Sequence, residues 1–247
     1  MKEVFSSFSI YGPMIGMPLF FALVLPSLTA YVTIHAAPII ASELTKQSIS
    51  VPSGGSATEL LFLNFFAVNV LGPIFLTMPI FTAAVIAADS FAGEKERRTS
   101  ESLLSMPVEA NELLLGKILA SFIPTILLTL LVFLVYGLTM NYFAYHYFQT
   151  YVLPTPAWLL MIATLPFLAL APIALIVLVS SHVKGIKEAQ QISTLLILPV
   201  LIMPFVSELG VVDLTPEFFA YVIAALIVID AAILYLGVKT FKKEAIM

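Results

Sequence analysis

Six stretches of the sequence are long, apolar and almost free of charge, and they constrain the fold more than any other feature. They cover residues of about 12–35, 62–88, 116–140, 157–181, 190–208 and 218–238. A helix needs about 20 apolar residues to cross the hydrocarbon core of a bilayer. Only 11% of the chain is charged, whereas a soluble domain carries about 25%. The pattern therefore predicts an all-α membrane protein with about six transmembrane helices.

The first and fifth stretches differ from an ordinary span. The first is longer than the apolar core of about 7–15 residues in a secretory signal, which predicts an uncleaved first helix. The fifth contains Pro199 and Pro204 and reaches Glu208 early. A short or broken span is expected there, followed by a partly re-entrant segment. The remaining sequence is too short for a second soluble domain, so residues 1–247 are expected to form one transmembrane domain.

Lysine and arginine are sorted unequally between the two sides of the membrane. With six spans both termini share one side, which holds 10 of the 11 basic residues, and the opposite side holds only Lys46. Basic residues are enriched in the cytoplasmic loops of membrane proteins. The sequence therefore predicts cytoplasmic termini in a multi-pass protein, which we expect in the plasma membrane.

Residues 89–117, between the second and third stretches, form the only long charged segment. Within it Glu94 and Arg98, and likewise Arg97 and Glu101, have the i,i+4 spacing of neighbours on a helix. Apolar residues of the segment can supply the other side, which predicts an amphipathic helix along the inner face. Pro107 is expected to end it, and a new helix from about Glu109 leads into the third span. Two interpretations follow: a solvated connector held by local ion pairs, or a docking element for a cytoplasmic partner.

The same segment resembles the motif of the ABC-2 family of export permeases. In that family a Gly-Glu, a charged run and a Thr precede a Leu-Leu-Ser/Thr-x-Pro turn and a Gly-Lys. This sequence has matching residues in Ala92–Thr99, Glu101–Val108 and Leu114–Lys117, with no gap in the spacing. It departs from the motif at Arg98, where the family usually has Gly, and at Glu109, where a small polar residue is usual.

The resemblance implies a partner and a docking site. Such permeases work as dimers, with a second copy or a homologous permease, and each subunit seats on a separate ATPase. The segment from about Ala92 to Ser105 would be the coupling helix between spans 2 and 3. The residues implied in docking are Gly93, Glu94, Lys95, Glu96, Arg97, Arg98, Thr99, Glu101, Leu103 and Leu104.

Nucleotide chemistry is expected on the partner. The chain has no G-x-x-x-x-G-K-[ST] loop, because Gly116-Lys117 is followed by Ile118 and lacks the earlier Gly. We therefore expect no cofactor and no ATPase activity on this chain, with ATP and Mg bound by the partner subunit. No nucleic-acid partner is expected, since no block of basic residues forms an electrostatic footprint.

Three polar residues inside the spans are candidates for a translocation path: Asp230, Asn64 and Asn69. A charge at depth is costly and usually faces a bundle interior or a cavity, whereas amides in spans often form hydrogen bonds between helices. Each residue could therefore serve packing or passage.

The sequence contains little that could support catalysis or metal binding. It has no cysteine, and its three histidines lie at span ends without ligand spacing, so no metal site is expected. No nucleophile and base pair appears, so no catalytic residue is assigned. The principal hypothesis is the permease subunit of an ATP-driven exporter working by alternating access. The alternative is a membrane-embedded enzyme or assembly factor without an ATPase partner, which would use Asp230 or the acidic residues of the outer face.

Overall fold

The protein is described by a computed structural model that covers residues 2–46, 55–96, 110–180, 183, 185–209 and 213–244. All regular structure in these ranges is helical. The elements are α1 (Lys2–Lys46), α2 (Gly55–Phe65), the π-helix η1 (Phe66–Leu71), α3 (Gly72–Glu96), α5 (Ala110–Phe148), α6 (Pro156–Val179), α7 (Ile186–Thr194), α8 (Ile197–Glu208) and α9 (Pro216–Glu244).

Six helical segments of the described chain are long and apolar enough to cross a membrane, as the sequence predicts. They are Ile15–Ala36, Glu59–Gly93, Asn111–Phe148, Pro156–Val179, Ile186–Ser207 and Pro216–Lys239. The second and third are longer than predicted. A helix can continue through polar residues, because its hydrogen bonds join backbone groups. Hydropathy therefore locates the part of a helix that faces lipid, but it does not locate the residues at which the helix ends.

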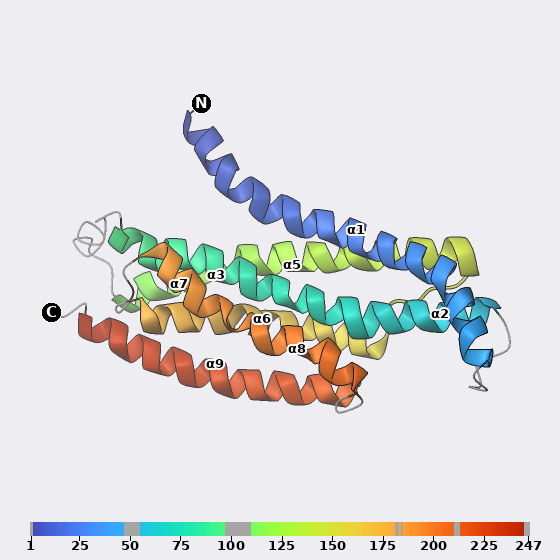
Figure 1. Ribbon diagram of the computed structural model, residues 1–247. Coiled ribbons are helices and arrows are strands. Elements are labelled where there is room, and N and C mark those ends of the chain that lie inside the picture. The colour runs from blue at the N-terminus through green and yellow to red at the C-terminus, as the bar shows by residue number, and fades with distance from the viewer. Residues whose placement is uncertain are drawn as a thin grey trace.

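Helix α3 lies at the centre of the bundle. It packs against α5, α6, α7 and α8, while α1 runs along α5, and α9 packs mainly on α6. Figure 1 shows both chain termini at the end of the bundle where α3 ends and α5 begins. We call this the inner end, because the distribution of basic residues predicts that it faces the cytoplasm.

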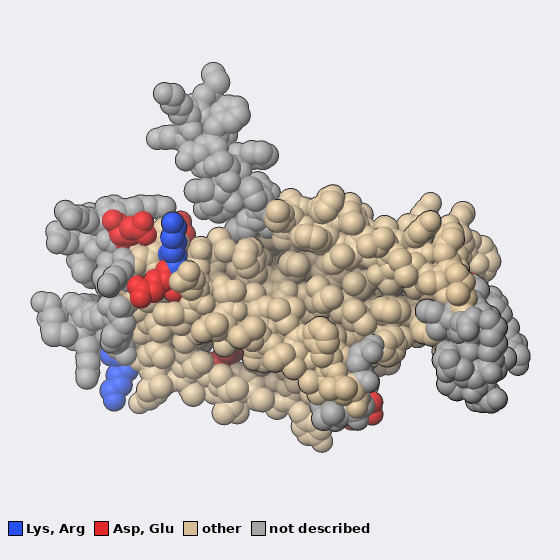
Figure 2. All heavy atoms as spheres, in the orientation of Figure 1, with Lys and Arg blue, Asp and Glu red and all other residues tan. Residues whose placement is uncertain are grey.

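Most charged side chains on the bundle surface in view lie toward its ends, with one recessed acidic patch between them (Figure 2). Figure 2 shows acidic and basic side chains gathered at the inner end and an almost uniformly tan surface between the ends. The described lysines Lys117, Lys187 and Lys239 lie near the inner ends of α5, α7 and α9. This arrangement is the one a lipid-embedded surface requires, since a charge facing hydrocarbon is costly.

Small residues bring the helices close together. A run of buried alanines on α3, including Ala84 and Ala88, packs with Ala169 and Ile173 of α6 in a cluster toward the inner end. A methyl group added at Gly237 of α9 would lie 3.0 Å from Val177 Cγ1. Lipid tails are as apolar as the side chains, so close van der Waals packing is what holds such helices together.

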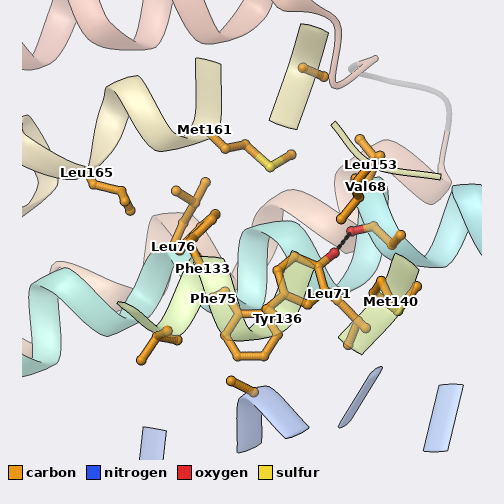
Figure 3. Packing of buried hydrophobic residues seen from close by; sticks show 14 of the residues in the cluster. Val68, Leu71, Phe75, Leu76, Phe133, Tyr136, Met140, Leu153, Met161 and Leu165 are labelled. Atoms are coloured by element: carbon orange, nitrogen blue, oxygen red, sulfur yellow. Dashed lines mark hydrogen bonds between the residues drawn. The ribbon is translucent and has the colours of Figure 1, made fainter. Parts of the chain in front are cut away.

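The second span is interrupted by the π-helix η1, which the sequence reasoning did not predict. The N–H of Gly72 bonds to the carbonyl of Ala67, and the buried Tyr136 hydroxyl of α5 donates to the same carbonyl. Figure 3 shows this hydrogen bond among closely packed hydrophobic residues. Pro73 follows Gly72 and has no N–H. The π-helical hydrogen bonds therefore end just before a residue that could not donate an α-helical hydrogen bond.

The outer connection between α5 and α6 is held by one side chain. Asn141 donates from Nδ2 to the Leu153 carbonyl at 2.7 Å. Its Oδ1 accepts from the backbone N–H groups of Val152 and Leu153 at 3.1 and 2.9 Å. Thr155 then caps α6 by accepting from the N–H of Trp158. Asn141 therefore satisfies three backbone groups of this short connection, the N–H groups of Val152 and Leu153 and the carbonyl of Leu153.

We predict that Tyr136→Phe destabilises the bundle by about 1–3 kcal/mol, because the buried Ala67 carbonyl loses the hydroxyl donor while the ring packing is kept. Thermal unfolding in detergent measures the change. The exposed Tyr142 of the same helix provides the matched control, Tyr142→Phe, which should leave the midpoint unchanged. Equal midpoints for the two variants would mean that the hydroxyl does not stabilise η1.

Candidate functional site

The predicted docking segment begins at the inner end of α3. Glu94 and Lys95 belong to the last turn of this helix, and only their backbone is described. Six further residues of the predicted set lie outside the described residues: Arg97, Arg98, Thr99, Glu101, Leu103 and Leu104. The amphipathic coupling helix therefore stays a prediction. The expected new helix after Pro107 is present, since α5 begins at Ala110.

Glu96, the last residue of α3, reaches across to α7. Its Oε2 accepts a hydrogen bond of 3.1 Å from the backbone N–H of Ile186, the first residue of α7. The first N–H groups of a helix have no intrahelical acceptor, and a carboxylate there is favoured by the helix dipole. The residue preceding α7, Gly185, has no side chain to serve as a cap. Glu96 fills this role from a segment 90 residues earlier in the sequence.

Two glycines make the approach of α3 and α7 possible. A methyl group added at Gly185 would lie 2.7 Å from Glu96 Oε2, closer than real contacts allow. The backbone of Gly185 is extended, so its need for glycine comes from this space and not from its dihedral angles. A methyl group at Gly93 would lie 3.3 Å from Ile186 Cδ1 and 3.1 Å from Asp89 Oδ1. Gly93, predicted in docking, is thus a buried packing position.

Helix α7 is amphipathic and lies across α3 (Figure 1). Its Ala189 and Ser193 are buried, one turn apart on the same face, whereas Lys187 and Glu188 are exposed. The buried face joins the inner cluster of α3 and α6.

The fifth span is broken, as predicted. Between α7 and α8 the N–H of Leu196 bonds to Ser193 O and the N–H of Leu198 bonds to Leu195 O, both with i→i−3 spacing. An α-helix would join Leu195 O to the N–H of residue 199, which is a proline and has none. Tightened turns of this kind inside a helix often mark a hinge.

A comparison with known protein families identifies the architecture. The family model described as ABC-2 family transporter protein matches residues 14–219. The chain belongs to the ABC-2 transporter family. No match was found among curated proteins, and none was found among solved structures. The resemblance seen in residues 92–117 is confirmed, and the protein is a multi-pass membrane component of an ABC transporter.

Among the described acidic and basic residues of this ABC-2 protein, Asp230 is the most deeply buried, with 3% of its surface exposed. It lies on α9, seven residues before Gly237 and hence on nearly the same face, which packs against α6. Neither carboxyl oxygen has a hydrogen-bond partner. Helix α6 contains no charged residue that could compensate it. A buried polar group without a partner destabilises the folded protein. Ionisable residues inside membrane spans are often functional, so such a position indicates a role other than stability.

Asn64 and Asn69 lie elsewhere in the bundle. Asn64 is exposed near the end of α2, and Asn69 lies in η1 and donates to the Phe65 carbonyl at 3.2 Å. Segments α2 and η1 pack on α1, α3 and α5, whereas α9 packs mainly on α6. The three candidate path residues are therefore distributed over different helix interfaces.

The outer end carries an aromatic hollow of about 320 Å³. Tyr142 stacks on His146, and Tyr145 stacks on Tyr151, across the connection that Asn141 holds in place. Aromatic and histidine rings at a span end suit the membrane interface. Among the described residues, no three His, Asp or Glu side chains gather as metal ligands would.

We predict that Asp230→Leu raises the thermal unfolding midpoint, because it replaces an unpaired buried carboxyl by an apolar group of similar size. A gain of about 1–3 kcal/mol is expected. Scanning fluorimetry in detergent measures it, with the exposed Ile229→Leu as the control on the same helix. A lower midpoint for Asp230→Leu would show that the carboxyl forms a stabilising interaction.

Proposed function

We propose that the protein is the permease subunit of an ATP-driven exporter in the plasma membrane. The family match over residues 14–219 carries this proposal. A separate ATPase subunit docks on the loop between α3 and α5, and its cycle switches the permease between inward and outward access.

ATP binding and hydrolysis take place on the partner chain. The sequence has no phosphate-binding loop, and its single Gly-Lys pair, Gly116–Lys117, lies in the second turn of the continuous helix α5. A phosphate-binding loop requires an irregular glycine-rich turn before the helix, with free backbone N–H groups. The helical environment of Gly116 and Lys117 supports assigning ATP and Mg to a partner subunit.

A second permease completes the transporter. Helices α1, α8 and α9 present many large apolar side chains at the protein surface, including Phe20, Phe205 and Tyr235. Lipid covers part of this surface, and an adjacent permease covers the rest, supplied by a second copy or by a homologous chain. The alternative of an enzyme acting through Asp230 gains no support from α6, which contains no acidic residue to pair with that carboxyl.

The experiment that tests the proposal is purification of the tagged chain from its native membranes in mild detergent, with mass spectrometry of the co-purifying proteins. A stoichiometric subunit that binds and hydrolyses ATP is the expected result. Purification of the chain alone, or with partners that bind no nucleotide, would overturn the proposal.

We predict that reversing Arg97 and Arg98 to Glu reduces the yield of co-purified ATPase at least about tenfold, since a buried or partly buried charge pair lost at an interface costs more than 1.4 kcal/mol. The control is Lys239→Glu, which reverses an exposed charge at the inner end of α9. An unchanged ATPase yield with Arg97 and Arg98 reversed would place the docking site elsewhere.

A further inference from the structure

We propose that Glu96 is a positioning residue that ties the docking loop to the broken fifth span. The inference rests on the proposed function and concerns how the movement of one loop reaches a different span. Glu96 ends α3, directly before the loop on which the ATPase is proposed to dock, and its carboxylate holds the first N–H of α7. A force on that loop therefore reaches α7 through the Glu96 hydrogen bond as well as through the packing of the two helices.

The contact is supported by packing on both sides of the hydrogen bond. Gly185 leaves the space that the carboxylate occupies, and Gly93 leaves the space that Ile186 occupies. The neighbouring Phe91 and Ala92 of α3 and Ala189 of α7 are buried in one cluster. The end of α3 and the start of α7 thus form a single packed unit, with Glu96 closing its solvent side.

The far end of α7 is where this unit can move. After Thr194 the helix gives way to the i→i−3 turns at Leu195 and Leu196, and α8 continues as a separate helix. Both helices pack on α3, and the tightened turns between them are the point at which the angle of α8 to α7 can change. Loop movement transmitted by Glu96 is converted into reorientation of α8 at the break.

A carboxylate cap is suited to this task. It joins two segments that are distant in the sequence, and its contribution to the free energy of folding is about that of an ordinary helix cap. Breaking it leaves both helices and their buried packing intact but frees the first turn of α7 from Glu96. This predicts that loss of the cap uncouples α8 from the ATPase without abolishing folding, docking or ATP hydrolysis.

The variants separate the contact from the charge. Glu96→Ala removes the acceptor, Glu96→Gln keeps a carbonyl oxygen at the same reach, and Gly185→Ala displaces the carboxylate while leaving Glu96 in place. The control is Glu112→Ala, which removes an exposed carboxylate at the same end of the bundle on α5. Because Glu96→Ala and Gly185→Ala break the same contact, the double variant should be no worse than either single variant.

The first measurement is amide hydrogen exchange at the start of α7 in the full chain. Exchange should be about fivefold faster in Glu96→Ala and Gly185→Ala, the factor expected from loss of a cap, and unchanged in Glu96→Gln and Glu112→Ala. Unchanged exchange in Glu96→Ala would overturn the proposal at its first step, independently of any partner.

The second measurement follows α8 in the complex with the co-purified ATPase, reconstituted in lipid nanodiscs. The chain has no cysteine, so Phe205→Cys, at a position 71% exposed on α8, accepts an environment-sensitive fluorophore at one site. Addition of ATP should change the fluorescence of the otherwise unmodified chain. That change should fall at least about threefold in both Glu96→Ala and Gly185→Ala. Because Glu96 belongs to the predicted docking set, Gly185→Ala is the variant that should retain the ATPase yield.

The outcomes distinguish this inference from the function on which it rests. A full fluorescence response in Glu96→Ala, with the ATPase bound, overturns the role of Glu96 and leaves the exporter proposal intact. Loss of ATPase yield in Glu96→Ala but not in Gly185→Ala would make Glu96 a docking residue and overturn the inference. Failure of any ATPase to co-purify with the unmodified chain removes the proposed function and this inference together.

Discussion

The structure depends on one constraint: within the bilayer every backbone N–H and carbonyl must find its partner inside the protein. Long helices meet this requirement by themselves, and the irregular points show how it is met elsewhere. At η1 the Ala67 carbonyl accepts from both Gly72 and Tyr136. At the break before α8, a shortened turn serves the Leu195 carbonyl that Pro199 cannot reach. Each departure from the α-helix therefore comes with its own compensation.

The same constraint shapes how the helices are held together. Asp230 is the one acidic or basic side chain that is buried among the described residues, so close contact of small residues replaces ion pairing, as in the alanines of α3 and at Gly237 of α9. Charged side chains gather at the ends, where water is available (Figure 2). The contact between Glu96 and Ile186 lies at the inner end of the bundle, where a hydrogen bond to a helix can form and break in contact with water.

Much of the fold was predictable from the sequence because hydropathy acts locally. The number of spans, the helix after Pro107 and the break near Pro199 all follow from composition and from the chemistry of proline. The family could be inferred from residues 92–117, because the order and spacing of motif residues are read directly from the sequence. Helix ends were placed less well, since α3 and α5 continue beyond their apolar stretches.

The contacts at the candidate site could not be predicted in the same way. Glu96 and Ile186 are 90 residues apart, and nothing in either local sequence indicates the other. Gly93 matched a family motif, but its reason, the space needed by Ile186, appears only when α7 is packed on α3. The burial of Asp230 against α6 depends likewise on which helices are neighbours. Pairings between distant segments are set by the assembled bundle.

The π-helix has a consequence for how the second span tolerates changes in length. A π-turn accommodates more residues per turn than an α-turn, so Phe66–Leu71 holds surplus backbone within an otherwise regular helix. Removing one residue there would let the segment tighten into an α-helix. The side chains before and after it would then still point in nearly the same directions. A deletion farther along α3 would instead rotate every later side chain by about 100°. Natural length variation in this span should therefore concentrate between Phe66 and Leu71.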